Sequence, residues 1–97
     1  MVLNRINLNI VEFAIKETLE LATEARLLQD QLENTLQYLA NNEKYFKDGK
    51  ISKRTYEKNK NRLENEKNIL STRIEENSKN ILESMKNLEK TFKDSKI

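Results

Sequence analysis

The sequence lacks the residues that most catalytic and metal sites use. Its 97 residues include no Cys, His, Trp or Pro, and only one Gly. Without Cys and His there is no disulfide, no thiol nucleophile, no zinc or haem ligation and no Ser-His-Asp triad. No phosphate-binding glycine loop or dinucleotide fingerprint occurs either. We therefore expect no catalytic residue, no metal site, no cofactor and no small-molecule substrate.

The sequence also lacks a large excess of one sign of charge, and it has no long apolar run. The chain has 18 Lys+Arg and 16 Asp+Glu, which gives a net charge of +2, although 35% of its residues are charged. This balance is not that of a strongly basic nucleic-acid binder. Apolar runs are too short for a bilayer span or for the apolar core of a signal peptide. We expect one domain over residues 1–97, located in the cytoplasm.

The single glycine marks a turn. Asp48 and Gly49 form the only strong turn signal between two long stretches rich in Glu, Lys and Leu. Gly49 suits the left-handed position after a helix, and Ser52 suits the N-cap of the next one. Ile51 and Tyr56 flank that cap as a hydrophobic staple would. We predict hairpin-turn roles for Asp48, Gly49 and Ser52.

Two long helices follow from this turn. Because Pro is absent, nothing interrupts a helix on either side of Gly49. The pattern predicts one helix over about residues 8–48, a turn at 49–51 and a second helix over about 52–94. The predicted fold is all-α, an antiparallel coiled-coil hairpin.

The apolar positions pair across the turn as an antiparallel hairpin requires. Seven pairs have residue numbers that add to 102, and their spacing is that of a coiled-coil seam. The predicted intramolecular seam comprises Ile10, Ala14, Leu21, Leu28, Leu32, Leu39, Phe46, Tyr56, Leu63, Leu70, Ile74, Ile81, Leu88 and Phe92. The same rule also produces three poorly matched pairings: Ala25 with Asn77, Thr35 with Lys67, and Asn42 with Lys60. We interpret these as polar layers that fix the register at some cost in stability.

The first helix has more apolar residues than one seam requires. A second stripe runs beside the seam, and apolar residues of the second helix lie at a similar height. A contiguous apolar stripe of this kind usually marks an interface. The predicted oligomer or partner interface is Val11, Ile15, Leu19, Ala22, Leu82 and Met85. We expect a homodimer, paired into a four-helix bundle.

The sequence leaves open two other ways in which this stripe could be covered. Residues 1–9 could fold back over it with Val2, Leu3, Ile6 and Leu8. A different protein could also occupy it, and the sequence does not distinguish that partner from a second copy.

Basic residues are concentrated around the turn, while the first helix is acidic. This tip could contact an anionic membrane, nucleic-acid phosphates or the acidic part of a neighbouring copy, or it could be simply solvated. The candidate anion-contacting residues are Lys47, Lys50, Lys53, Arg54 and Lys58.

Residues 45–56, followed by Lys60 and Leu63, resemble two known helical hairpins. One is the SHOCT-like short hairpin, in which a Gly-x-Ile-Ser/Thr turn precedes an aromatic residue and Lys-x-x-Leu. The other is the long helical hairpin of ESCRT-III and ESCRT-I subunits, where a similar Asp-Gly-Lys turn joins two helices. The first resemblance implies an oligomerisation or tethering element, and the second a subunit of a membrane-remodelling assembly.

The predicted function is therefore a non-enzymatic protein-protein interaction module, a scaffold or subunit of a larger cytoplasmic complex. The alternative prediction is a protein that binds nucleic acid or an anionic membrane through the basic tip.

Overall fold

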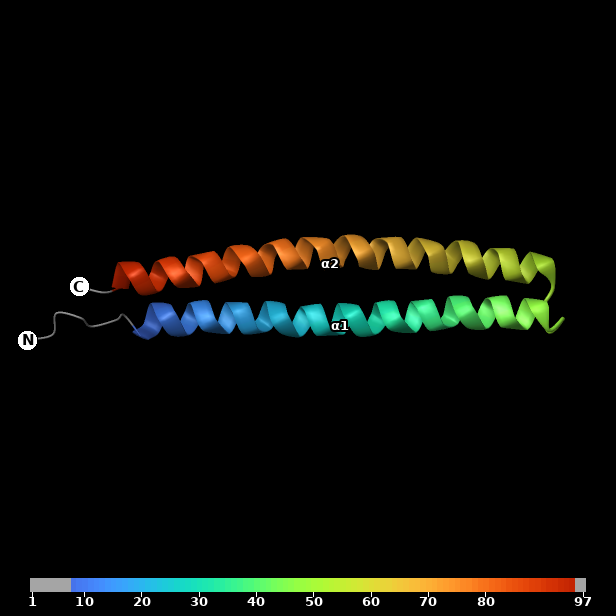
Figure 1. Cartoon of the computed structure of the whole chain (residues 1–97), viewed down its shortest axis with the longest axis horizontal. Helices are drawn as coiled ribbons and strands as arrows, with labels where there is room; N and C mark the ends of the chain where they lie inside the picture. Colours follow the sequence, from blue (N-terminus) through green and yellow to red (C-terminus); the bar gives the residue numbers. More distant parts are fainter. Residues whose placement is uncertain (1–7, 96–97) are drawn as a thin grey trace, which may run out of the picture. The chain divides into compact units, whose positions relative to one another are not determined.

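The computed structural model describes residues 8–95 and consists there of two helices and a turn. Helix α1 is Leu8–Lys47 and helix α2 is Lys53–Ser95, with no strand among the described residues (Figure 1). The prediction of an all-α chain with two long helices is confirmed. The residues that would fold back over the stripe, Val2, Leu3 and Ile6, lie outside the described part of the chain.

The chain divides into two compact units, each built from one stretch of both helices. The terminal unit combines the chain up to Arg26 with the chain from Glu76 onward. The turn unit is Leu27–Glu75.

A Schellman motif centred on Gly49 closes the C-terminus of α1. Gly49 has a φ of 72°, in the left-handed region that favours glycine. The Lys50 amide donates to the Tyr45 carbonyl at 2.8 Å and the Gly49 amide to the Phe46 carbonyl at 3.1 Å. These are the two hydrogen bonds that close a helix C-terminus in this motif.

Ser52 begins the second helix. Its Oγ accepts from the Thr55 amide at 3.1 Å, and its carbonyl accepts from the Tyr56 amide at 2.9 Å, which is the N-cap geometry. Thr55 occupies the position where a capping box has Glu or Gln. Instead, the Ser52 hydroxyl donates to the Thr55 Oγ1 at 3.0 Å.

In the turn unit, the two helices pack along one seam. Most of its buried and half-buried residues recur at steps of three and four, the coiled-coil spacing. Phe46 and Tyr56 stack next to the turn, with ring centroids 4.3 Å apart. Leu28, Leu63 and Leu70 are buried. The seam residues of this unit are Leu28, Leu32, Thr35, Leu39, Asn42 and Phe46 on α1, and Tyr56, Asn59, Leu63, Lys67, Leu70 and Ile74 on α2.

The terminal unit has the same kind of seam, but the residues at its outer end differ from the predicted ones. Val11 is only 6% exposed, whereas the predicted seam residue Ile10 is 52% exposed. Thr91 is half-buried, whereas Phe92 is 37% exposed. Strict alternation of steps leads from Thr18 through Ala14 to Val11, so Val11 belongs to the seam rather than to the outer stripe. The seam residues of this unit are Val11, Ala14, Thr18, Leu21 and Ala25 on α1, and Asn77, Ile81, Ser84, Leu88 and Thr91 on α2.

A buried asparagine from α1 joins the helices in the turn unit. Asn42 is 5% exposed, and its Nδ2 donates to the Tyr56 carbonyl at 3.0 Å. Its Oδ1 accepts from Asn59 Nδ2 at 3.2 Å. The expected partner Lys60 lies instead with its Nζ 5.7 Å from the centre of the Tyr56 ring. Both the amide nitrogen and the amide oxygen of Asn42 therefore have a hydrogen-bond partner on α2.

The terminal unit has two polar layers of its own. Asn77 is 4% exposed and its Nδ2 donates to the Leu21 carbonyl at 3.1 Å. The Thr18 hydroxyl donates to the Ala14 carbonyl at 3.0 Å, so the Ser84 hydroxyl donates to Thr18 Oγ1, 2.7 Å away. Among the described residues, every buried side-chain nitrogen and oxygen has a hydrogen-bond partner. None of these groups is therefore buried without a hydrogen bond to offset part of its desolvation.

Candidate protein-interaction surface

The antiparallel arrangement sorts the outer residues of the terminal unit onto two sides. In both right-handed helices, one residue corresponds to a rotation of about 100°. Because the helices run in opposite directions, the residues that directly follow a seam residue lie on the same side of the pair in both. The residues that directly precede a seam residue lie on the opposite side.

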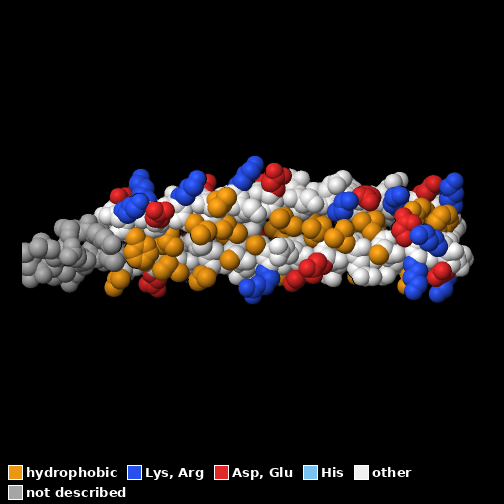
Figure 2. Space-filling view, viewed as in Figure 1, with side chains coloured by type: hydrophobic (Ala, Val, Ile, Leu, Met, Phe, Trp, Pro, Cys, Tyr) orange, Lys and Arg blue, Asp and Glu red, His pale blue; other side chains and the backbone are white. Residues whose placement is uncertain are grey.

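The side that follows the seam holds most of the exposed apolar residues of the terminal unit, together with the carboxylates of Glu12 and Glu89. Leu19 directly follows Thr18 and is 62% exposed, and Leu82 directly follows Ile81 and is 59% exposed. Figure 2 shows apolar side chains gathered along this face. We call this surface the apolar face. Its residues, which are all exposed, are Leu8, Ile15, Leu19, Ala22, Leu82, Met85 and Phe92.

The apolar face contains most of the interface that the sequence predicts. Ile15, Leu19 and Ala22 come from α1, and Leu82 and Met85 come from α2. Val11 is absent from it because it is buried between the helices. Phe92, which the sequence assigned to the seam, lies on this face instead. A shallow groove there is lined by Leu82, Met85, Lys86, Leu88, Glu89 and Phe92.

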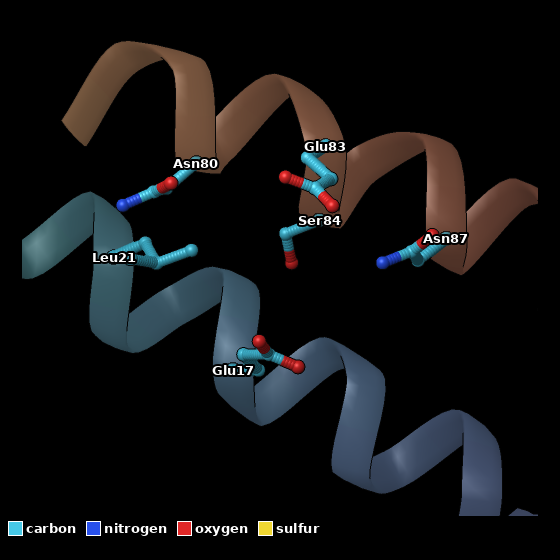
Figure 3. A pocket seen from close by; sticks show the side chains of 6 residues that line it. All are labelled: Glu17, Leu21, Asn80, Glu83, Ser84 and Asn87. Atoms are coloured by element: carbon cyan, nitrogen blue, oxygen red, sulfur yellow. The ribbon is translucent and has the colours of Figure 1, made fainter. Parts of the chain in front are cut away.

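The opposite side of the terminal unit is more polar, although it also exposes Ile10 and Phe13, at 52% and 69%. A groove of about 250 Å³ lies there, and Figure 3 shows a carboxylate from each helix and two amides from α2 along it. Its lining residues are Glu17, Leu21, Asn80, Glu83, Ser84 and Asn87. The polar groove therefore lies on one side of the terminal unit, and most of its exposed apolar residues lie on the other.

The turn unit offers a more mixed surface. Tyr38 is 59% exposed and Ile69 is 44% exposed, and both line a shallow groove beside Arg73 and Glu66. This groove combines one aromatic ring with charges of both signs, so it lacks the uniform character of the apolar face.

The five candidate residues of the basic tip are exposed. Lys47 stands in the last turn of α1, where a cation is favoured by the helix dipole. The Lys50 ammonium lies 5.7 Å from the centre of the Tyr45 ring. Lys53 and Arg54 begin α2, and the first turn of that helix has no acidic residue. Lys58 is also exposed.

One titratable contact secures the beginning of α2. The Tyr56 hydroxyl donates a hydrogen bond to Glu43 Oε1. This bond to a carboxylate, with a smaller contribution from desolvation, raises the pKa of the Tyr56 hydroxyl above its ordinary value of 10.0. The contact links the two helices next to the buried Asn42, so it supports the same register.

The described part of the chain holds neither a candidate metal site nor a candidate membrane span. Residues 8–95 contain no group of three or more acidic or other metal-ligating side chains placed to hold a metal ion. Neither α1 nor α2 combines the length and apolar character that crossing a bilayer requires.

Comparison of the chain with protein-family models, curated proteins and solved structures finds no match.

Proposed function

We propose that this protein is a non-enzymatic assembly module whose apolar face binds another protein surface, in the first instance that of a second copy. The observation that supports this most directly is that most of the exposed apolar residues of the terminal unit lie on one side. Leu19, Leu82 and Met85 each expose more than half of their surface there. Contiguous exposed patches of this kind mark interaction sites on otherwise polar proteins.

The proposed dimer pairs two apolar faces, so that four helix segments enclose one core. Each helix of a hairpin buries one narrow stripe in its own seam, and a second hairpin would bury the stripe beside it. A two-fold dimer uses the same patch on both copies, which requires a patch complementary to itself. The apolar face meets this requirement because its residues are aliphatic or aromatic on both helices.

Within this proposal the module works as a scaffold or subunit of a larger cytoplasmic complex. The resemblance of the turn sequence to oligomerisation hairpins and to ESCRT-type hairpins is consistent with that role. The basic tip would then extend the complex toward an additional, acidic surface.

Sedimentation equilibrium tests the proposal. At micromolar concentration we expect the wild type to sediment with twice the chain mass. The variant Ile15→Glu/Leu19→Glu should sediment as one chain, because its apolar face carries two uncompensated charges per copy. The matched control is Phe13→Glu/Leu27→Glu, which adds the same charge at residues that directly precede a seam residue and are 69% and 59% exposed. This control should remain a dimer.

A wild type that stays at one chain mass up to high micromolar concentration would contradict self-association. Equal dissociation of both variants would instead place the interface elsewhere. Circular dichroism on all three proteins should show the same helix content, which separates loss of association from loss of folding.

A second candidate function rests on the first turn of α2. Lys53 and Arg54 occupy a helix N-terminus, where the helix dipole disfavours each cation by about 0.3–1 kcal/mol. Local stability therefore does not explain these residues, whereas contact with an anionic membrane or nucleic acid would. Cosedimentation with anionic vesicles and with DNA at low salt tests this function, and Lys53→Gln/Arg54→Gln should reduce any binding.

A further inference from the structure

The two sides of the turn unit carry opposite net charge. Within Leu27–Glu75, all of which the structure describes, three cations and one carboxylate directly precede a seam residue. The carboxylate, Glu66, is paired with Arg62 at 3.2 Å. On the side that follows the seam, the same unit has five glutamates and two lysines. The side that precedes the seam is therefore the one that attracts an anion.

Two exposed tyrosines lie on that positively charged side. Tyr38 and Tyr45 each directly precede a seam residue, and they are 59% and 43% exposed. Seven residues separate them on α1, which is a rise of about 10 Å along one face of the helix. The Lys50 ammonium lies 5.7 Å from the centre of the Tyr45 ring. We call this surface the basic side. Its residues are Tyr38, Tyr45, Lys50, Lys58, Arg62 and Arg73.

A groove of about 450 Å³ lies beside Tyr38. Gln31 and Asn34 line it from α1, and Ile69 and Arg73 line it from α2. Every exposed or half-buried residue of this lining directly precedes a seam residue, so the groove lies on the basic side. It brings together an aromatic ring, a guanidinium and amides that can donate and accept hydrogen bonds.

We propose that the basic side binds single-stranded nucleic acid, with an unpaired base stacked on Tyr38 and phosphates beside Arg62 and Arg73. Proteins that bind single strands without sequence preference combine cations along the backbone with aromatic rings on which bases stack. Lys58 and Arg73 are about 22 Å apart along α2, so several successive phosphates can be contacted. The basic side is separate from the apolar face, and the inference therefore does not rest on self-association.

The composition of the groove favours a single strand over other anionic partners. A membrane surface rewards cations that flank bulky apolar side chains, but the groove exposes one aliphatic side chain, Ile69, among amides and charges. A duplex keeps its bases stacked on one another, which leaves none for Tyr38. Unpaired bases can use both the ring of Tyr38 and the amides of Gln31 and Asn34.

Fluorescence anisotropy with a fluorescein-labelled oligothymidylate at low ionic strength tests the site. Tyr38→Ala should raise the Kd roughly five- to hundredfold, because the stacking of one base is lost. Tyr38→Phe retains the ring and should bind like the wild type. Arg73→Gln should raise the Kd and also lower the slope of log Kd against log salt concentration by about 0.7, the value for one phosphate contact of a single strand.

Two matched controls change similar groups on the side that follows the seam. Leu36 directly follows Thr35 and is 46% exposed, and Arg26 directly follows Ala25 and is exposed. Leu36→Ala and Arg26→Gln should leave the Kd nearly unchanged. Circular dichroism should show the same helix content in all variants, which separates loss of binding from loss of folding.

A second readout uses the absence of tryptophan from the chain, which has three tyrosines. Because a stacked base quenches tyrosine fluorescence, oligothymidylate should quench the wild type more strongly than Tyr38→Ala. Several results would overturn the proposal: no binding of oligothymidylate at low salt, equal Kd values for wild type and Tyr38→Ala, tighter binding of a duplex, or binding of phosphatidylserine vesicles alone. Sedimentation equilibrium should find Tyr38→Ala as dimeric as the wild type, so a failure of this site and a failure of self-association are measured separately.

Discussion

At the scale of single residues, buried polar side chains define how the two helices meet. Asn42 of α1 donates to a backbone carbonyl of α2, and Asn77 of α2 donates to a backbone carbonyl of α1. A shift of one helix along the other would break both bonds, and it would also separate Asn42 from its side-chain partner Asn59. The narrow leucine seam alone would tolerate such a shift more easily. We infer that these two asparagines specify the pairing that the leucines stabilise.

Replacing Asn42 tests this role. Asn42→Ala leaves Asn59 Nδ2 without its acceptor and removes the donor to the Tyr56 carbonyl, so we expect the free energy of unfolding to fall by about 1–3 kcal/mol. Urea denaturation followed by circular dichroism measures it. Asn34→Ala, at an exposed position of the same helix, should change the free energy by less than about 0.5 kcal/mol. Equal effects of the two substitutions would contradict a special role for the buried layer.

At the scale of elements, the turn and the two helices were predictable from the sequence because local chemistry determines them. Gly49 takes the left-handed conformation, and Ser52 supplies the N-cap, as their residue types indicate. The pairing of Phe46 with Tyr56 follows from the mirror symmetry of the apolar positions. These features lie close to the turn. There, a small error in the assumed number of residues per helical turn hardly changes which side chains meet.

The outer end of the seam and its polar layers were harder to predict. Ile10 and Val11 are equally apolar neighbours, so composition does not distinguish them, and only the strict alternation of steps selects Val11. Thr18 and Ser84 carry no apolar signal, although they satisfy the same mirror rule as the leucines. Their contact depends on a hydroxyl–hydroxyl bond between helices, which a hydropathy pattern does not reveal. The exposed apolar face was largely predictable because it repeats the helical period.

The seam predicts a sharp contrast between two leucines. Leu63 is 3% exposed, so Leu63→Ala should lower the free energy of unfolding by about 2–5 kcal/mol through lost burial and an unfilled cavity. Leu27 is 59% exposed, and Leu27→Ala should change it by less than about 0.5 kcal/mol. Thermal or urea unfolding of both variants makes the comparison. A large loss at Leu27 would show that the seam is assigned to the wrong face of α1.

At the scale of the whole molecule, one contrast connects structure to the proposed function. The terminal unit places exposed aliphatic side chains on one side and a polar groove lined by Glu17 and Asn80 on the other. An isolated hairpin would gain nothing in stability from this asymmetry, since water covers both sides equally. A hairpin that pairs with a second copy gains the hydrophobic free energy of the covered face, about 25 cal/mol per Å² of apolar area buried. We therefore explain the asymmetry as that of an interface.

The most direct test observes the apolar face itself as the protein is diluted. Met85 is 54% exposed on this face, and it is the one methionine among the described residues. A carbon-13 label on the methionine methyl groups gives Met85 its own NMR signal, which Met85→Leu would identify. We predict that this signal shifts when the protein is diluted through the dimer Kd, in step with the dimer fraction that sedimentation measures. A Met85 methyl signal that stays at one position while the dimer dissociates, or a wild type of one chain mass at every concentration, would contradict self-association through the apolar face.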